Sequence, residues 1–370
     1  SELDLYIRFF DKDGAPLSDA YKVKKIKDIS KVRKPALEMD TMGNALLLWE
    51  DHREEAPDFP SDVRFQCFAS NGTPADTAKT LYSTPGIDYV KPISLSNKGQ
   101  FVVVAPISSY FFPLGTGIWV RRFDLDGIPK DSAFLAHDDL DDFLPKDTIH
   151  FAYPQVALND AGDILVTWLH FIETSHMYPR FQVFDAQDKP ILPWEPLGYR
   201  LDNGGEEAGA CSPQPHWLDD ERFLVFWTDY TVPPYTSSHL LGRVFSDKGA
   251  TRHPIKTLMW ADTLGYLGGA KGEFSTAVAP NDSFAYTHTR SYCDYPDTSN
   301  PWKMRKWEHG AGFLGSVVNN EPWRMTNLFE YTPPLGADTV NSFFNNFNHV
   351  QPPAVACSND RIVWVYSRFN

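Results

Sequence analysis

Several histidine, tyrosine and arginine residues stand where short apolar segments of the chain end, and their side chains suit acid–base chemistry. Imidazole and phenol groups can transfer protons, and a guanidinium can neutralise a carboxylate. A polysaccharide lyase needs a base and a cation beside a uronate carboxylate, and a hydrolase needs a proton donor and a base. The catalytic candidates are therefore His150, Tyr153, His170 and Arg290.

A larger group of aromatic and polar residues lies in or beside the longer polar segments, where it could line a binding pocket. Aromatic rings offer a flat surface to a sugar or another flat ligand. The alternative is that these rings only pack the loops against one another. The ligand-binding candidates are His52, Tyr110, Tyr178, Asp229, Tyr230, Tyr292, Trp302, His349 and Arg368.

If several of these histidines converge at the centre of the fold, they could also bind a divalent ion such as zinc or copper. The chain has neither the H-E-x-x-H nor the C-x-x-C spacing of a local metal motif. A single histidine at a strand end is more often a hydrogen-bonded structural residue. The metal content therefore stays open, and the pattern requires no cofactor.

Composition and absent motifs exclude several classes of protein. No serine nucleophile elbow, Walker loop or dinucleotide-binding glycine motif occurs. The net charge of −14 argues against nucleic acid as the main partner. The longest apolar run, about residues 164–172, is shorter than the roughly 18 residues that membrane insertion needs. The first residues lead directly into a strand pattern, so we expect a secreted or periplasmic protein whose leader has been removed.

These candidates must be positioned by a repeat that runs through the chain. A polar residue, any residue, an aromatic residue and an Asp- or Gly-containing turn recur with the aromatic at 10, 68, 123, 184, 245 and 307. A second pattern, clearest at residues 154–168, is Pro-x-Val-Ala-Leu, an Asn/Asp/Gly turn, and a strand that ends in Trp. Each repeat thus supplies four short strands, A to D in chain order. Short strands with regular turns at this spacing predict an all-β fold, a six-bladed β-propeller of four-stranded antiparallel blades.

The two ends of the chain each carry half a repeat. The N-terminal half has strands C and D, and the C-terminal half has strands A and B. We expect them to pair in one blade, which closes a single propeller domain over residues 1–370 and removes exposed sheet edges. The predicted units are 35–91, 92–153, 154–212, 213–274, 275–352, and 353–370 joined with 1–34.

Together, Pro-x-Val-Ala-Leu-Asn-x-x-Gly-x-x-x-Val-x-Trp and Arg-x-Phe-Asp-x-Asp-Gly-x-Pro resemble the repeats of bacterial secreted β-propeller proteins. The likeness covers nearly the whole chain and implies a fold without a single activity. Residues 154–190 match it best. The fifth unit departs from it most, since it lacks the leading Pro and the Trp of strand B.

The predicted connections differ in length at the two ends of the strands. The A–B and C–D turns are short, whereas the B–C and D–A connections are long, so functional residues are expected on the long-connection face. The long B–C loops are 51–62, 106–117, 170–179, 229–239 and 291–302. The long D–A connections are 138–153, 201–212, 261–274 and 328–352.

Cysteine and aspartate residues leave two further alternatives. Cys211 and Cys293 are predicted on neighbouring blades at the same face, where a disulfide could form, while Cys67 and Cys357 lie on strands as buried thiols. The Asp-x-Asp-Gly segments at 11–14 and 124–127 are either calcium ligands or hairpin turns. Turn chemistry is favoured, because an EF-hand glutamate is missing.

Three functions are consistent with this pattern. The main hypothesis is a recognition propeller that binds a carbohydrate or a partner protein on the long-connection face. The second is a polysaccharide-active enzyme, lyase or hydrolase. The third is a structural subunit of a larger assembly. The ligand and the oligomeric state stay open.

Overall fold

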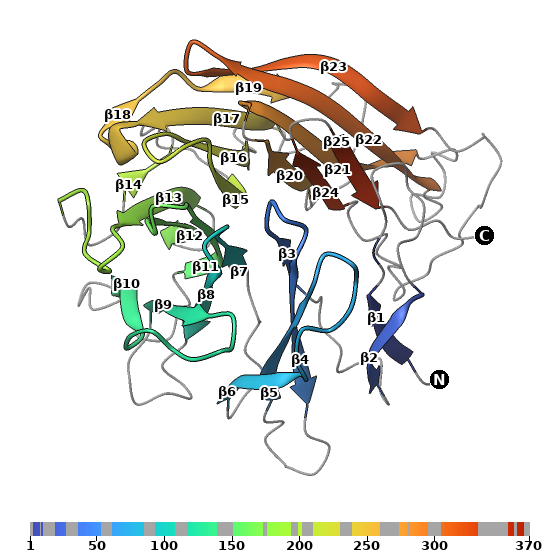
Figure 1. Ribbon diagram of the computed structural model, residues 1–370. Coiled ribbons are helices and arrows are strands. Elements are labelled where there is room, and N and C mark those ends of the chain that lie inside the picture. Colours follow the sequence, from blue (N-terminus) through green and yellow to red (C-terminus); the bar gives the residue numbers. More distant parts are fainter. Residues whose placement is uncertain are drawn as a thin grey trace. The chain divides into compact units, whose positions relative to one another are not determined.

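The computed structural model describes most of the strands and short turns of the chain (Figure 1). The described residues are 3–7, 9, 19–26, 36–52, 61–84, 93–107, 117–138, 151–172, 176–193, 199–201, 210–229, 239–259, 274–279, 281–294, 305–331, 354–358 and 361–365. Within these ranges the protein is all-β, and the helical structure is the short 3-10 turn Asp247–Gly249.

Four sheets have four strands each, in chain order. Blade 1 contains β3 (Ala36–Met39), β4 (Ala45–His52), β5 (Ser61–Phe68) and β6 (Lys79–Thr84). Blade 2 contains β7 (Ile93–Leu95), β8 (Gln100–Ile107), β9 (Gly117–Asp124) and β10 (Phe134–Asp138). Blade 3 contains β11 (Phe151–Leu158), β12 (Ile164–Ile172), β13 (His176–Phe184) and β14 (Tyr199–Arg200). Blade 5 contains β20 (Phe274–Val278), β21 (Ser283–Asp294), β22 (Arg305–Val318) and β23 (Glu321–Tyr331).

Three further sheets have other strand numbers. Blade 4 contains β15 (Ala210–Trp217), β16 (Phe223–Asp229), β17 (His239–Ser246), β18 (Thr251–Arg252) and β19 (Lys256–Met259). Both β18 and β19 pair with β17. The two-stranded sheets are β1 (Leu3–Ile7) with β2 (Tyr21–Ile26), and β24 (Ala354–Ser358) with β25 (Arg361–Val365). The predicted all-β fold and its repeat of four antiparallel strands are thus confirmed.

The chain divides into two compact units, residues 1–168 with 181–199, and residues 169–180 with 200–370. In the first unit β3 lies beside β7 and β7 beside β11, and in the second β15 lies beside β20 and β20 beside β24. Apolar side chains fill the space between successive sheets, as where Phe65 meets Phe101 or Phe226 meets Phe284. Within each unit, sheets therefore stack face to face with their first strands adjacent, which is how propeller blades pack.

The polar residue of the repeat has a structural task. It stands two positions before the buried phenylalanine of strand C. In blades 1, 2 and 4 its side chain donates to a carbonyl oxygen in the segment that follows the C–D turn, whereas Gln182 of blade 3 makes no such bond within the described residues. Arginine at this position also lies over the phenylalanine ring, as Arg243 does over Phe245. The same bond recurs in three blades: Gln66 to Asp76 (2.8 Å), Arg121 to Asp131 (3.3 Å) and Arg243 to His253 (2.7 Å).

Aspartates in the short turns bind their own backbone. Asp126 Oδ1 accepts from the amide of Ile128 at 3.2 Å, and Gly127 has a φ of 82° that suits glycine. Asp185 Oδ1 accepts from the amides of Gln187 and Lys189. The hairpin-turn interpretation of residues 124–127 is therefore confirmed, while residues 11–14 lie outside the described ranges.

Blade 5 corrects the predicted register of the repeat. The sequence pattern puts its C–D turn just after Trp307, but β22 continues to Val318 and the turn is at Asn319 and Asn320, which have φ values of 53° and 59°. Trp307 is instead the Cα partner of Tyr292, far from that turn.

The residue of blade 5 that replaces the repeat's phenylalanine is Gly315. In blade 4 the first residue of strand B, Phe223, pairs with Phe245, and their rings stack at 4.9 Å. In blade 5 the corresponding pair is Phe284 and Gly315. A Cβ at Gly315 would lie 2.1 Å from the Phe284 ring, so this ring covers the glycine and fills the space alone. Because this position is a glycine in blade 5, a sequence pattern based on aromatic residues does not detect the repeat there.

Three of the predicted long connections are shorter in the structure. Strands β12 and β13 leave only residues 173–175 between them, and β21 and β22 leave 295–304. Strand β23 extends to Tyr331 and so enters the segment 328–352. The other predicted connections agree with the observed strand ends to within three residues.

Arginines join neighbouring blades at the short-turn ends of the strands. Arg122 of β9 reaches both turns of blade 3. Its Nε lies 2.6 Å from Asp188 Oδ1, and its Nη1 and Nη2 donate to the carbonyls of Gly162 (2.6 Å) and Asp185 (2.7 Å). Both groups of the ion pair are largely buried, with side chains 4% and 15% exposed.

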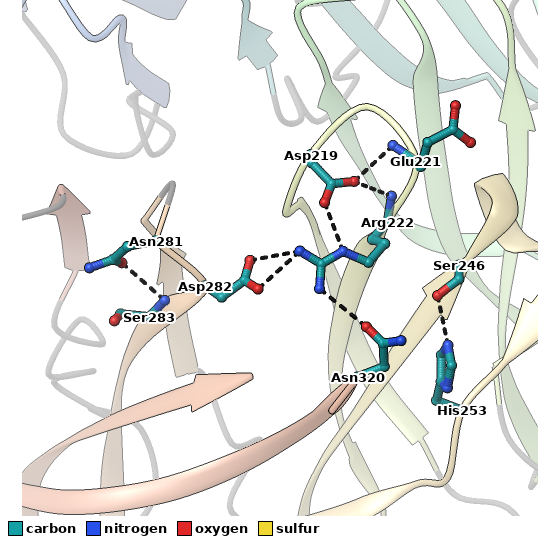
Figure 2. A network of polar contacts seen from close by, with 9 residues as sticks. All are labelled: Asp219, Glu221, Arg222, Ser246, His253, Asn281, Asp282, Ser283 and Asn320. Atoms are coloured by element: carbon teal, nitrogen blue, oxygen red, sulfur yellow. Dashed lines mark hydrogen bonds and ion pairs between the residues drawn. The ribbon is translucent and has the colours of Figure 1, made fainter. Parts of the chain in front are cut away.

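Arg222 has the same task between blades 4 and 5 (Figure 2). It is held by Asp219 of its own turn at 2.7 Å. It donates to Asp282 in the A–B turn of blade 5 at 2.9 Å and to Asn320 in the C–D turn at 3.1 Å. At the short-turn end of the strands, Arg122 and Arg222 therefore each hold two neighbouring blades together.

Candidate functional site

The structure describes the predicted site residues unequally. His52, Tyr153, Asp229, Arg290 and Tyr292 lie in strands β4, β11, β16 and β21, where the backbone is described. His170 and Tyr178 are described with their side chains. Outside the described residues are Tyr110, His150, Tyr230, Trp302, His349 and Arg368.

His170 and Tyr178 are both buried. Their exposed fractions are 4% and 8%, and the guanidinium of Arg200 lies 4.1 Å from the centre of the Tyr178 ring. A ring covered in this way packs against a cation and offers little surface to a ligand. The burial of His170 favours a structural task over proton transfer to a substrate.

Asp229 lies where the end of strand B meets the beginning of strand A. Its Cα partners are Ala210, the first residue of β15, and His239, the first residue of β17. This pairing agrees with the expectation that strand-B ends and strand-A starts share the long-connection end of a blade.

Several reactive residue types lie together on the long hairpin of blade 5. Strands β21 and β22 have 12 and 14 residues, whereas their counterparts β16 and β17 in blade 4 have 7 and 8 (Figure 1). The extra length lies beyond His288, the Cα partner of Phe274, which is the first residue of β20.

Three successive register pairs occupy one face of this extension, because residues two apart along a strand and direct antiparallel partners share a face. We term them the row set. Its rows are Arg290 with His309, Tyr292 with Trp307, and Asp294 with Arg305. The next pair inward is His288 with Ala311, whose partner on β23 is Glu330.

The row set explains which site residues the sequence pattern missed. Arg290 and Tyr292 were candidates, but Arg305, Trp307 and His309 were read as a strand-C end and its turn. The residues at 308–310, Glu-His-Gly, resemble a turn, whereas the turn of the structure is at Asn319 and Asn320, after the end of β22. Register shifts beside Gly312 and Gly315 accommodate the extra residues of the long strand.

A second polar group lies between the first strands of blades 4 and 5. Thr276 Oγ1 donates to Gln214 Oε1 at 2.7 Å, and the Thr276 amide donates to the same oxygen at 2.9 Å. His216 Nε2 is 2.6 Å from Thr276 Oγ1. Because the hydroxyl proton is used for Gln214, the imidazole donates through Nε2–H. His216 therefore acts as a strand-to-strand clasp and does not activate the threonine.

Polar residues occupy this register position of strand A in other blades too. Ser94 of β7 corresponds to His216, and its Oγ accepts from the Leu158 amide of the next blade at 2.9 Å. Glu38 of β3 stands at the same position, and burial raises the pKa of its carboxyl to about 7. Glu38 can thus retain a proton near neutral pH, which the sequence pattern did not reveal.

We expect the contribution of His216 to the unfolding free energy to fall as pH drops from about 6.5 to 4, while Glu38, whose pKa is raised, contributes in the opposite direction. Burial lowers the pKa of His216 from 6.5 to about 4, so its neutral form is favoured in the folded state. The stabilisation by neutral His216 is fully present above pH 6.5, the pKa of the unfolded state. As pH falls from 6.5 to about 4, the pKa of the folded state, about 3 kcal/mol of unfolding free energy is lost. Denaturant titrations between pH 7 and 4 would measure this as the difference between the wild type and His216→Gln, since the Glu38 contribution is common to both, and the wild type should lose stability relative to the variant as pH falls. His253→Gln is the control, and an equal slope in all three proteins would contradict the assignment.

The cysteines are partly described. Cys67 is free, its Sγ donates to the Leu125 carbonyl at 3.3 Å, and burial raises its pKa to about 11. Cys211 and Cys293 lie in β15 and β21, opposite Thr228 and Lys306, and their disulfide stays a prediction. The described residues contain no cluster of three or more His, Cys, Asp or Glu side chains that could hold a metal ion.

No helix in the described part of the chain is long and apolar enough to cross a membrane. No family model matches the chain, and no curated protein matches it either.

Several solved structures are similar to this chain. A Bacillus subtilis levansucrase in complex with oligosaccharides is 10% identical, with 81% of this chain and 88% of that chain covered and a TM-score of 0.42. A levansucrase of B. megaterium is 9% identical, with coverages of 86% and 87% and a TM-score of 0.42. An endo-arabinase from Bacteroides thetaiotaomicron is 10% identical, with coverages of 75% and 93% and a TM-score of 0.38.

Proposed function

We propose that this protein is a polysaccharide-active enzyme whose site lies at the row set of blade 5. The observation that supports this most is the register of β21 and β22, which puts a cation, an imidazole and two aromatic rings in adjacent pairs. The Tyr292–Trp307 row suits the flat face of a sugar. The Arg290–His309 row next to it supplies a positive charge and a group that can exchange a proton near neutral pH.

The row set changes the roles first assigned to the histidines. His309 takes the acid–base role, because it is the register partner of Arg290, whereas His170 is buried in blade 3. His150 and Tyr153 stay predicted catalytic residues, but they are not part of the row set. Asp229, at the long-connection end of blade 4, is proposed to contact the same ligand.

A panel of polysaccharides tests this proposal. We expect release of shorter products from at least one of them, measured by product chromatography, and a loss of about 100-fold or more in turnover for His309→Gln. His253→Gln is the matched control, since His253 bonds to Ser246 in blade 4 at 2.7 Å. Circular dichroism confirms that both variants fold. Unchanged turnover in His309→Gln would refute the assignment of the site.

A recognition module for carbohydrate or protein is the second candidate. The Tyr292–Trp307 row favours it specifically, because paired aromatic residues bind sugars without any chemistry. Binding of a polysaccharide that no preparation of the protein shortens, together with loss of binding in Trp307→Ala, would establish this function in place of the enzyme.

The six-bladed ring is also a proposal. We propose that β24–β25 and β1–β2 form one blade as its A–B and C–D halves. In the first unit Ile7 and Phe9 pack with Leu47 and Trp49 of blade 1, and in the second unit β24 lies beside β20 and β21 of blade 5. Each half-blade therefore already lies on a neighbour appropriate to its place in a ring. Closure would make the propeller a single domain over residues 1–370.

Secretion or export to a periplasm remains part of the proposal. It is supported by the strand ends on which Cys211 and Cys293 lie, because β15 and β20 are adjacent first strands and β21 pairs with β20. A disulfide between them would suit an oxidising compartment. Titration of thiols in denaturant should give two groups, and four free thiols would refute the bridge.

A further inference from the structure

The length and the charge pattern of the row set indicate which class of carbohydrate it would bind. This inference rests on the proposed function. Strands rise by about 3.4 Å per residue, so the positions 290 to 294 span about 14 Å. This distance is longer than a single sugar ring. A ligand that uses all three rows must therefore be an oligosaccharide chain.

The charges of the row set are unequal at its two ends. Arg305 has an acid, Asp294, as its register partner, so the outer row is balanced. Arg290 has His309 as its partner, and the middle row of Tyr292 and Trp307 is uncharged. The nearest acid inward is Glu330, opposite Ala311 on β23. Within the rows themselves, the inner end is thus a cationic position beside an aromatic one.

A cationic position of this kind is notable on a chain with a net charge of −14. The overall field repels an anionic polymer, so attraction has to come from a local pairing. An arginine binds planar carboxylates with two hydrogen bonds, and it binds sulfate by similar geometry.

We infer that the row set binds an anionic oligosaccharide, with a sugar carboxylate or sulfate at Arg290 and the adjoining sugar on Tyr292 and Trp307. The carboxylate case corresponds to a uronate chain, and the sulfate case to a sulfated glycan. Both share the recognition of an oxyanion by a guanidinium next to an aromatic platform.

Calorimetry with matched polymers tests the inference. Polygalacturonate is compared with its fully methyl-esterified form, and dextran sulfate with dextran, so that the members of each pair share a sugar backbone and differ in charge. We expect one charged member to bind about 10- to 100-fold more tightly than its neutral counterpart. The preferred pair identifies the oxyanion. Arg290→Gln should remove the preference, and Lys306→Gln is the control that should retain it, because Lys306 and its register partner Cys293 lie on the other face of the hairpin.

The outcomes separate this inference from the proposed function. Equal binding of charged and neutral members would overturn the anionic ligand and leave a carbohydrate site in place. A charge preference that survives in Arg290→Gln would overturn the assignment to the row set. Absence of binding and of turnover with every polymer tested would overturn the proposed function itself, and this inference with it.

Discussion

Leu37→Asp is expected to destabilise the protein by about 3 kcal/mol or more, although Leu37 is 57% exposed. Leu37 and Met39 on β3 are register partners of Leu47 and Ala45, so these four positions share one face of blade 1. The β1–β2 sheet covers Leu47 and Ala45 but leaves the β3 residues exposed. In a closed ring β24–β25 would cover them, and a carboxylate would then be buried without a partner.

Ile128→Asp is the matched control for this experiment. Ile128 is 59% exposed in the C–D turn of blade 2, where ring closure covers nothing, so we expect less than about 0.5 kcal/mol of change. Denaturant and thermal unfolding of both variants would give the comparison. Equal stability of the two variants would mean that no strand packs on β3 and that the ring is open.

Arg122→Ala should cost about 3–5 kcal/mol of unfolding free energy, because removing one partner leaves a buried charge uncompensated. The Asp188 carboxylate would lose its partner at 2.6 Å, and the carbonyls of Gly162 and Asp185 would lose their donors. Blades 2 and 3 would then be held at their short-turn ends by fewer polar contacts, chiefly the Asn97–Asp160 pair at 2.9 Å.

The neighbouring arginine provides the control. Arg121 makes one bond to the Asp131 carbonyl at 3.3 Å within its own blade, so Arg121→Ala should cost about 1 kcal/mol. In the double variant Arg122→Met with Asp188→Asn much of the loss should be recovered, since no uncompensated charge remains. A cost for Arg122→Ala no greater than for Arg121→Ala would contradict a blade-joining function.

Residues with a local task could be predicted from the sequence. The polar residue before each phenylalanine, the Asp and Gly of the turns and the Pro that follows them act within about ten residues, so their spacing recurs wherever the turn recurs. Phe68, Phe123 and Phe184 each bridge to the proline six residues later, at Pro74, Pro129 and Pro190. The order of strands A to D followed from these turns.

Blade 5 could not be predicted in the same way. Its strand C carries Gly315 where other blades carry phenylalanine, and the Phe284 ring from the paired strand covers it. In blade 5 the aromatic residue of this pair is on strand B alone, so strand C has no aromatic residue at the repeat position. Trp307, at nearly the expected spacing, was therefore mistaken for the missing ring.

By itself, then, the sequence determined the all-β fold, the four-stranded repeat and the division between short and long connections, because turn chemistry and strand alternation are local. The tertiary structure decided which residues meet across strands, since a pairing register depends on packing between segments far apart in the chain. It buried His170 and Tyr178 and placed Arg290 beside His309 and Tyr292 beside Trp307. The acid–base chemistry that the sequence suggested for histidines in separate segments is therefore proposed at the one extended hairpin of blade 5.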